Sequence, residues 1–277
     1  MKTRVLTGIC IGVVLAPILI FSHTWAYPIF LSLLAAIGVY EMHKCTGTAH
    51  ITTLLPALIV SLVMPVCARF YGSEQSFLNF AYKMIMLLFF LMFVSAVFSK
   101  GKRSITDVGL TFVMDFYMIM SFSSLVLLRD FENGRFIFGL VFISSWVTDI
   151  FAYFTGRLFG KHKLIPDVSP KKTVEGAIGG LVFCVASFVI YGIAVSKFVE
   201  NINVRLSAFA LVGLVMSVIS QCGDLIFSLV KRKYGVKDYG KILPGHGGIM
   251  DRFDSVIATA PFVLILFDLS SVFKLFN

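Results

Sequence analysis

The sequence predicts an all-α fold, a polytopic membrane helix bundle of about nine transmembrane helices. The first supporting observation is composition, because 58% of the 277 residues are hydrophobic and only 14% are charged. The mean hydropathy of +0.91 lies outside the range of soluble globular domains. The second observation is the spacing of the apolar runs, and the third is the distribution of basic residues between them.

Apolar runs recur along the whole chain. A bilayer core needs about 20 apolar residues per helix. Runs of suitable length lie at 5–22, 25–40, 51–68, 81–98, 108–128, 136–155, 176–197, 206–230 and 255–273. The first run follows Lys2 and Arg4 but lacks a signal-peptide cleavage pattern, so we expect it to remain attached. The second run is short, and a re-entrant segment there would lower the total to eight.

The basic residues indicate an orientation. If the N-terminus is cytoplasmic, alternating loops place most of the 24 Lys and Arg residues on the cytoplasmic side, as the positive-inside rule requires. Two basic segments, 157–172 and 231–252, then lie at the cytoplasmic face, where we expect the chemistry. The net charge of +9 fits this topology and attraction to anionic lipid headgroups. We expect a multi-pass protein of the inner (plasma) membrane.

We divide the chain into two parts of one continuous membrane domain. Residues 1–130 are expected to contain about five N-terminal transmembrane helices, and residues 131–277 about four catalytic ones with the two basic loops. No internal repeat or soluble domain is evident. The five cysteines are scattered without a CxxC pair, so we interpret them as packing residues.

The first polar constellation begins with Asp149, an acid inside an apolar run. Asp149 and Arg157 share one helical face, and acids within a membrane span usually face the bundle interior or an aqueous cavity. A purely structural ion pair between these two residues is the alternative. Residues 169–173 (Ser-Pro-Lys-Lys-Thr) are expected to be a loop that binds phosphate oxygens or is simply solvated. Gly176 and Gly180 have the small-xxx-small spacing that permits close helix packing.

The second constellation combines carboxylates, basic residues and glycines. Asp224 lies inside an apolar run, and Asp251 and Asp254 lie where the last one begins. Mg²⁺ prefers oxygen ligands, usually one or two carboxylates together with substrate phosphates. We therefore predict Asp224 and Asp251 as metal ligands. Asp254 is a third ligand, a residue behind the ligands, or a cap of the last helix.

One long motif carries a family resemblance. Residues 228–254 contain S-x-V-K-R-x4-K-D-x-G-x2-L-P-x-H-G-G-I-x-D-R-F-D, which resembles the signature of the phosphatidate cytidylyltransferase family. Residues 149–176 resemble the second motif of that family. The resemblance implies a reaction of CTP with phosphatidate that forms CDP-diacylglycerol and pyrophosphate in phospholipid biosynthesis. It also implies a Mg²⁺ cofactor and allows a second cation, and it implies that the protein is a homodimer.

The motifs together define the candidate site. The predicted catalytic residues are Asp224, Lys231, Arg232, Lys237, Asp251 and Arg252. The predicted substrate-binding residues are Asp149, Ser169, Lys171, Lys172, Thr173, Glu175, Ser228, Asp238, His246, Gly247 and Gly248. The predicted metal ligands are Asp224, Asp251 and Asp254. We assign no general base, because the phosphatidate phosphate is already anionic. We expect His246 to form hydrogen bonds in the segment that contains Gly240, Gly245, Gly247 and Gly248, which we call the Gly-rich loop.

Related lipid enzymes and a transporter are the alternative functions. A CTP-dependent polyprenol kinase or an ether-lipid cytidylyltransferase would use similar machinery, whereas a secondary transporter should show internal repeats and charges near mid-membrane. The expected partners are CTP, phosphatidate, membrane lipid and a second copy of the chain, but no nucleic acid. We expect Asp115 to be an interhelical hydrogen-bond partner and Asp268 to be interfacial, both outside the site.

Overall fold

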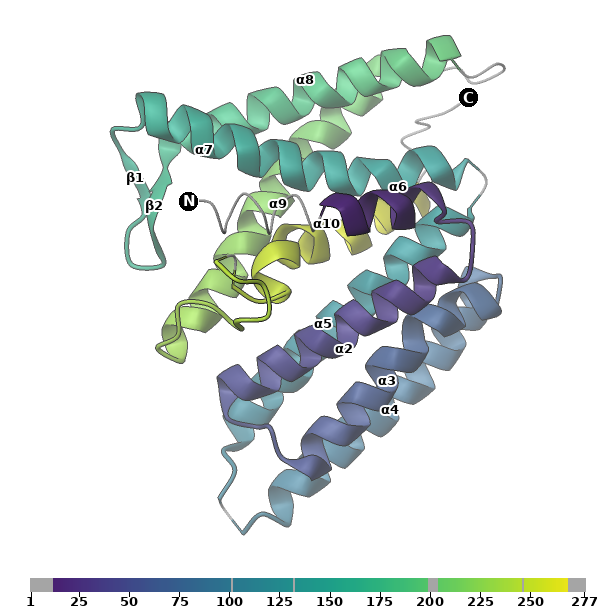
Figure 1. Ribbon diagram of the computed structural model, residues 1–277, viewed down its shortest axis with the longest axis vertical. Helices are drawn as coiled ribbons and strands as arrows, with labels where there is room; N and C mark the ends of the chain where they lie inside the picture. Colours follow the sequence, from purple (N-terminus) through teal and green to yellow (C-terminus); the bar gives the residue numbers. More distant parts are fainter. Residues whose placement is uncertain (1–11, 101, 132, 199–203, 246, 269–277) are drawn as a thin grey trace. The chain divides into compact units, whose positions relative to one another are not determined.

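The fold is almost entirely helical (Figure 1). The computed structural model describes residues 12–100, 102–131, 133–198, 204–245 and 247–268. The helices are α2 (Ala26–Thr46), α3 (Ile51–Phe70), α4 (Glu74–Val97), α5 (Ile105–Asp130), α6 (Gly134–Phe142), the π-helical turn η1 (Ile143–Val147), α7 (Thr148–Phe159), α8 (Val174–Phe198), α9 (Leu206–Lys233) and α10 (Met250–Asp268). Residues 12–20 are also helical.

Seven helical segments in the described part of the chain are long and apolar enough to cross a membrane. They coincide with the second to eighth predicted runs, so the all-α polytopic fold is confirmed. The first run lies partly outside the described residues, and α10 is not among the seven segments, so the count of nine stays a prediction. The short second run is a continuous 21-residue helix, α2.

The chain forms two compact units. The first unit comprises Met1–Phe131 and Lys233–Phe253, and the second comprises Glu132–Arg232 and Asp254–Asn277. Residues 233–253, which we assigned to the C-terminal part, group with the N-terminal helices, and the division of the chain at residue 130 stays a prediction. That the chain forms one continuous membrane domain stays a prediction, because the division into compact units does not test it.

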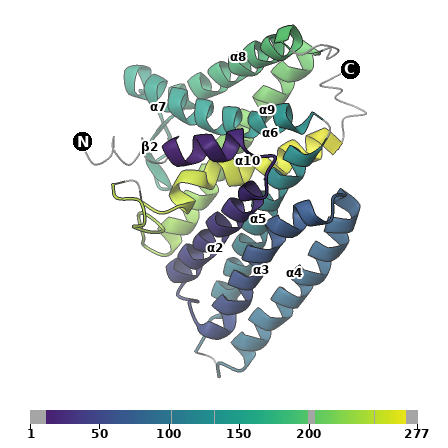
Figure 2. The same cartoon turned by 45° about the vertical axis from the view of Figure 1, so that its right-hand side comes forward.

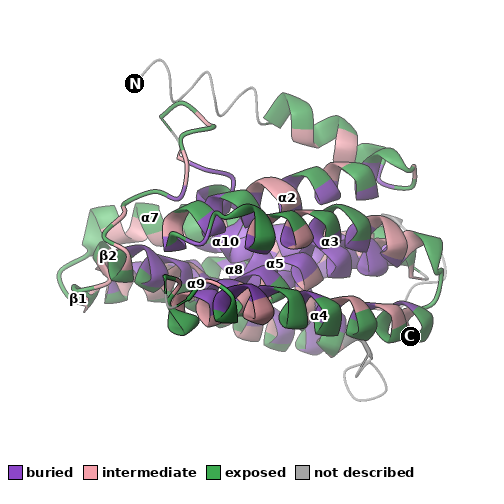
Figure 3. Cartoon of the chain, turned by 90° about the horizontal axis from the view of Figure 1, so that it is seen from below, coloured by how far each residue is buried: buried purple, intermediate pink, exposed green. Residues whose placement is uncertain are grey.

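The first unit is a bundle in which α2 packs on α3 and α5, and α3 packs on α4 (Figure 2). Buried residues follow the faces that these helices turn toward one another, and exposed residues follow their outer faces (Figure 3). Large apolar side chains remain exposed there, including Ile59 and Phe90. An exposed apolar face suits contact with lipid, because lipid tails solvate it as well as a protein core does.

In the second unit, α7 lies against α8 at short range. A Cβ atom at Gly176 would lie 2.7 Å from the Ala152 carbonyl oxygen, and one at Gly180 would lie 2.8 Å from that of Thr148. The close helix packing predicted from the glycine spacing is thus confirmed.

The prediction that residues 169–173 form a loop was wrong. Strand β1 (Lys163–Ile165) pairs with strand β2 (Ser169–Thr173) in an antiparallel hairpin between α7 and α8. Proline at position 170 suggested a turn, yet proline is tolerated in an edge strand, where its missing N–H costs no ladder hydrogen bond. A two-stranded hairpin offers such edges on both sides.

Candidate active site

Three carboxylates come from three helices of the second unit. Asp149 lies in the first turn of α7, Asp224 in α9 and Asp254 in α10. The Asp254 side chain is buried, and it interacts electrostatically with both Asp224 and Asp149. We call Asp149, Asp224 and Asp254 the acidic cluster. Burial, followed by the negative charges of Asp224 and Asp149, raises the pKa of the Asp254 carboxyl well above its usual range.

Hydroxyl groups orient this acidic cluster. The Ser255 hydroxyl donates to Asp149 Oδ2 at 3.0 Å, and the Ser228 hydroxyl donates to Asp224 Oδ1 at 3.2 Å. Arg157, the alternative partner predicted for Asp149, donates to the Tyr153 hydroxyl. The π-helical turn η1 directly precedes α7 and Asp149, and such turns recur at functional sites.

Two lysines supply positive charge to the acidic cluster. The Lys172 Nζ atom lies 2.7 Å from Asp224 Oδ2. Lys231, near the end of α9, is only 8% exposed and interacts electrostatically with Asp254. A buried lysine needs a partner charge, because the desolvation of an unpaired ammonium group is costly. The two polar constellations of the sequence therefore meet here through Asp149, Lys172, Ser228 and Lys231, and the roles predicted for these residues stay predictions.

The hairpin that carries Lys172 is fixed at its base and its tip. Glu175 Oε1 lies 2.6 Å from His162 Nδ1, and the Thr173 hydroxyl accepts the Gly176 N–H at 3.1 Å. Arg232 donates from Nε to the Val168 carbonyl oxygen at 3.1 Å, which joins the end of α9 to the hairpin turn. Glu175 and Thr173, which we predicted to bind substrate, thus make supporting contacts within the second unit.

Asp251 belongs to the first unit, where it holds the Gly-rich loop. Its Oδ2 atom accepts the N–H groups of Tyr239 and Gly248, at 2.8 and 2.9 Å. Gly247, with a φ of +87°, adopts a backbone conformation that favours glycine. The predicted role of Asp251 as a metal ligand stays a prediction, and these hydrogen bonds add a structural role.

Asp254 does not cap the last helix. α10 begins at Met250, so Asp254 lies inside the helix, and its Oδ1 atom accepts the N–H of Ser255 at 2.8 Å. The carboxylates that meet the start of α10 are those of Asp251 and Glu41.

Glu41 was missed by the sequence analysis. It lies in α2, is 2% exposed, and accepts the Ile249 and Met250 N–H groups at 3.1 and 3.0 Å. Its signal in the sequence was an acid directly after the predicted run 25–40, and an acid that becomes buried at such a position is costly unless a partner is present. Its partners are backbone groups distant in sequence, and backbone groups leave no compositional trace.

The other predicted site residues are distributed as follows. The side chains of Lys171, Arg232, Lys237, Asp238 and Arg252 are exposed. His246 lies outside the described residues. Within the described ranges, no group of three or more His, Cys, Asp and Glu side chains meets the geometric requirements of a metal site.

Known proteins resemble this chain over nearly its whole length. The family model described as "Cytidylyltransferase family" matches residues 2–270. The chain is 35% identical over 266 residues to a protein of Staphylococcus haemolyticus named phosphatidate cytidylyltransferase, covering 96% of this chain and 98% of that protein. A Staphylococcus aureus protein of the same name is 36% identical over 271 residues, with the same coverage.

Proposed function

Because this chain belongs to the cytidylyltransferase family, we propose that it transfers the CMP moiety of CTP to phosphatidate, the reaction for which its relatives are named. The products are CDP-diacylglycerol and pyrophosphate, so the protein is a membrane nucleotidyltransferase of phospholipid biosynthesis. The observation that carries the proposal is the acidic cluster, which meets Lys172 and Lys231 within the second unit.

The reaction joins two anions. A phosphate oxygen of phosphatidate attacks the α-phosphorus of CTP, and the bond from that phosphorus to the oxygen bridging to the β-phosphate breaks. Pyrophosphate leaves with the bonding electrons. Positive charge must offset the repulsion between the reactants and stabilise the negative charge of the transition state. Lys172 and Lys231 would supply it, and the adjacent residues Lys171 and Arg232 carry exposed basic side chains.

Mg²⁺ is the cofactor that suits the acidic cluster. Asp224 and Asp254 offer two carboxylates from two helices, which is the number that Mg²⁺ usually takes together with substrate phosphates, and Asp254 is buried close to the negative charges of Asp224 and Asp149. Asp224 and Asp254 would hold the cation, with Asp149 beside them, and Asp251 remains a predicted ligand. When bound, the cation would neutralise phosphate charge and assist the departure of pyrophosphate. A second cation, implied by the resemblance, is also part of the proposal.

Labelled CTP tests the function directly. Purified protein is given phosphatidate, Mg²⁺ and CTP that carries ³²P at the α-phosphate. Label recovered in a lipid together with released pyrophosphate is the expected result. Label retained in water-soluble CDP while a prenol becomes phosphorylated would favour a kinase. CTP left intact with every lipid would contradict nucleotidyl transfer altogether.

Variants connect the function to the acidic cluster. Asp224→Asn should abolish lipid labelling, whereas Asp167→Asn, the same change at an exposed turn residue of the second unit, should leave it unchanged. Equal activity of both variants would exclude the acidic cluster as the site while leaving the assigned reaction intact.

The N-terminus and the basic loops are proposed to be cytoplasmic, and the protein is proposed to be a homodimer. The support is the excess of Lys and Arg in the segments 157–172 and 231–252, and the family resemblance. In a cysteine-free background, Lys163→Cys should react with a membrane-impermeant maleimide only from the cytoplasmic side. Reaction from the opposite side would contradict the proposed orientation.

Light scattering in detergent tests the homodimer, and a monomeric mass would exclude it.

A further inference from the structure

We propose that Glu41 is a positioning residue for the transfer reaction, although it lies outside every motif in the sequence. Its carboxylate fixes the start of α10, and through it Asp251 and Arg252. The inference rests on the proposed function, because Asp251 and Arg252 at the start of α10 are predicted catalytic residues of the reaction assigned above. All the residues involved belong to the first unit.

The contact between Glu41 and α10 uses both carboxylate oxygens. Oε1 accepts the Ile249 N–H at 3.1 Å, and Oε2 accepts the Met250 N–H at 3.0 Å. Asp251 Oδ2 accepts the preceding N–H, that of Gly248, at 2.9 Å. Two carboxylates thus bind three consecutive N–H groups at the entry to α10, where a helix has N–H groups without intrahelical partners and a partial positive charge.

Two glycines make room for this contact. A Cβ atom at Gly240 would lie 2.8 Å from the Glu41 carboxyl carbon, and one at Gly248 would lie 2.6 Å from it. Both glycines belong to the Gly-rich loop of the long motif. Because glycine has no side chain, both positions leave space for the Glu41 carboxylate from α2. This packing accounts for glycine at positions 240 and 248 without requiring a bound ligand there.

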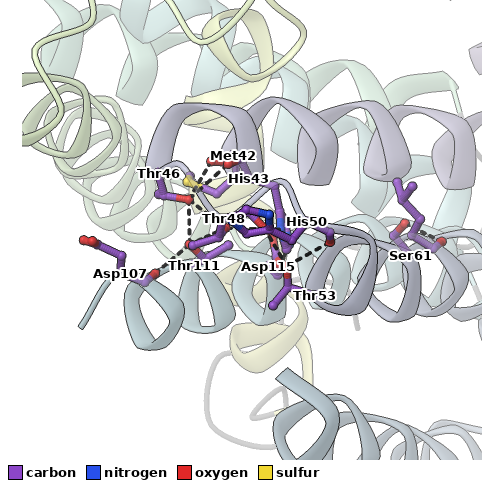
Figure 4. Close-up of polar contacts among 11 residues, drawn as sticks. Met42, His43, Thr46, Thr48, His50, Thr53, Ser61, Asp107, Thr111 and Asp115 are labelled. Atoms are coloured by element: carbon purple, nitrogen blue, oxygen red, sulfur yellow. Dashed lines mark hydrogen bonds and ion pairs between the residues drawn. The ribbon is translucent and has the colours of Figure 1, made fainter. Parts of the chain in front are cut away.

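A polar network that begins at His43, two residues after Glu41, joins α2 to α5 (Figure 4). His43 Nε2 lies 2.8 Å from Asp115 Oδ2 of α5, and both side chains are fully buried. The Thr111 hydroxyl of α5 donates to the Thr46 hydroxyl of α2 at 2.7 Å. These contacts fix α2 against α5 and so fix the helix that presents Glu41.

The arrangement costs more than a simple helix cap requires. A serine or asparagine caps a helix N-terminus without bringing in a charge. Here the buried Glu41 carboxylate lies close enough to Asp251 for their negative charges to interact. Costly arrangements of this kind persist where a precise geometry has a function. The function that fits is holding Asp251 and Arg252 in the geometry that the transfer reaction needs.

Glu41→Gln is the decisive variant, because glutamine keeps the size of the side chain but has one acceptor oxygen instead of two. Its amide NH₂ group would face the backbone N–H of Ile249 or Met250, and two donors cannot form a hydrogen bond with each other. We expect kcat per folded protein to fall about 100-fold, with a change in the KM for CTP of less than about threefold. Glu74→Gln, the same change in the first turn of α4, is the matched control and should keep wild-type kcat.

A second measurement separates positioning from folding. Asp251→Asn weakens the same loop and helix junction, so the combined effect of Glu41→Gln and Asp251→Asn on kcat should fall well below the product of the single effects. Multiplicative effects, or wild-type kcat per folded protein in Glu41→Gln, would overturn the inference. Failure of the wild type to label lipid would instead reject the proposed function, so the two failures are distinguishable.

Discussion

Lys172 of β2 and Asp224 of α9 form an ion pair, with 2.7 Å between Nζ and Oδ2, and each side chain is 26% exposed. They come from the first and the second polar constellation of the sequence, so the pair joins both constellations in one place. A partly exposed pair of this kind adds little to stability, typically less than about 1 kcal/mol. Its value therefore lies in placing a cation donor beside the acidic cluster.

Lys172→Gln separates stability from activity. We expect the free energy of unfolding to change by less than about 1 kcal/mol, because the pair is solvated. Turnover should fall about 100-fold, because a charge donor to the phosphates is lost. Thermal unfolding in detergent and the labelled-CTP assay measure the two effects. Lys163→Gln, an exposed lysine of β1, is the control, and an equal loss of turnover there would make the effect one of general surface charge.

Asp254→Asn is expected to abolish turnover yet stabilise the metal-free protein. The amide removes a buried negative charge that Asp224 and Asp149 oppose, and it keeps the oxygen that accepts the Ser255 N–H. We expect a gain on the order of 1 kcal/mol in the free energy of unfolding with EDTA present. The gain should shrink with Mg²⁺, which compensates the wild-type charges. A lower melting temperature of the variant in EDTA would contradict this account.

Gly176→Ala should loosen the packing of α7 on α8. The added methyl group would meet the Ala152 carbonyl oxygen, a backbone atom that cannot move aside without its helix. We expect a loss of about 1–3 kcal/mol, measured by thermal unfolding. Gly109→Ala in α5 is the matched control, since its nearest neighbour would be a Phe93 side-chain atom at 3.7 Å, and it should be neutral or slightly stabilising. A similar loss in both variants would indicate a generic effect of alanine.

Asp115→Ala should destabilise the first unit. It leaves His43 buried without its carboxylate partner, and loss of one member of a buried pair typically costs about 3–5 kcal/mol. The double variant with His43→Ala should lose less than the sum of the single variants, because the pair is removed as a whole. Additive losses in unfolding experiments would show that the two residues act independently.

The expected role of Asp115 as an interhelical hydrogen-bond partner is confirmed by its contact with His43. Its partner was not predictable, because the two residues are 72 positions apart and no local pattern in the sequence links them. The sequence also indicated that the candidate site residues lie in segments 149–176 and 224–254, since charged and glycine-rich segments stand out among membrane helices. The hairpin was missed because prolines and lysines also compose loops.

By itself, the sequence determined the class of fold, the positions of the membrane helices and the kind of chemistry, because apolar periodicity and local motifs are properties of neighbouring residues. Only the tertiary structure decided which acids meet. It placed Asp149, Asp224 and Asp254 together, grouped Asp251 with the first unit, and revealed Glu41 beneath the Gly-rich loop. The physical reason is that burial and backbone hydrogen bonding depend on residues distant in the chain, and Glu41 meets partners more than 200 positions away.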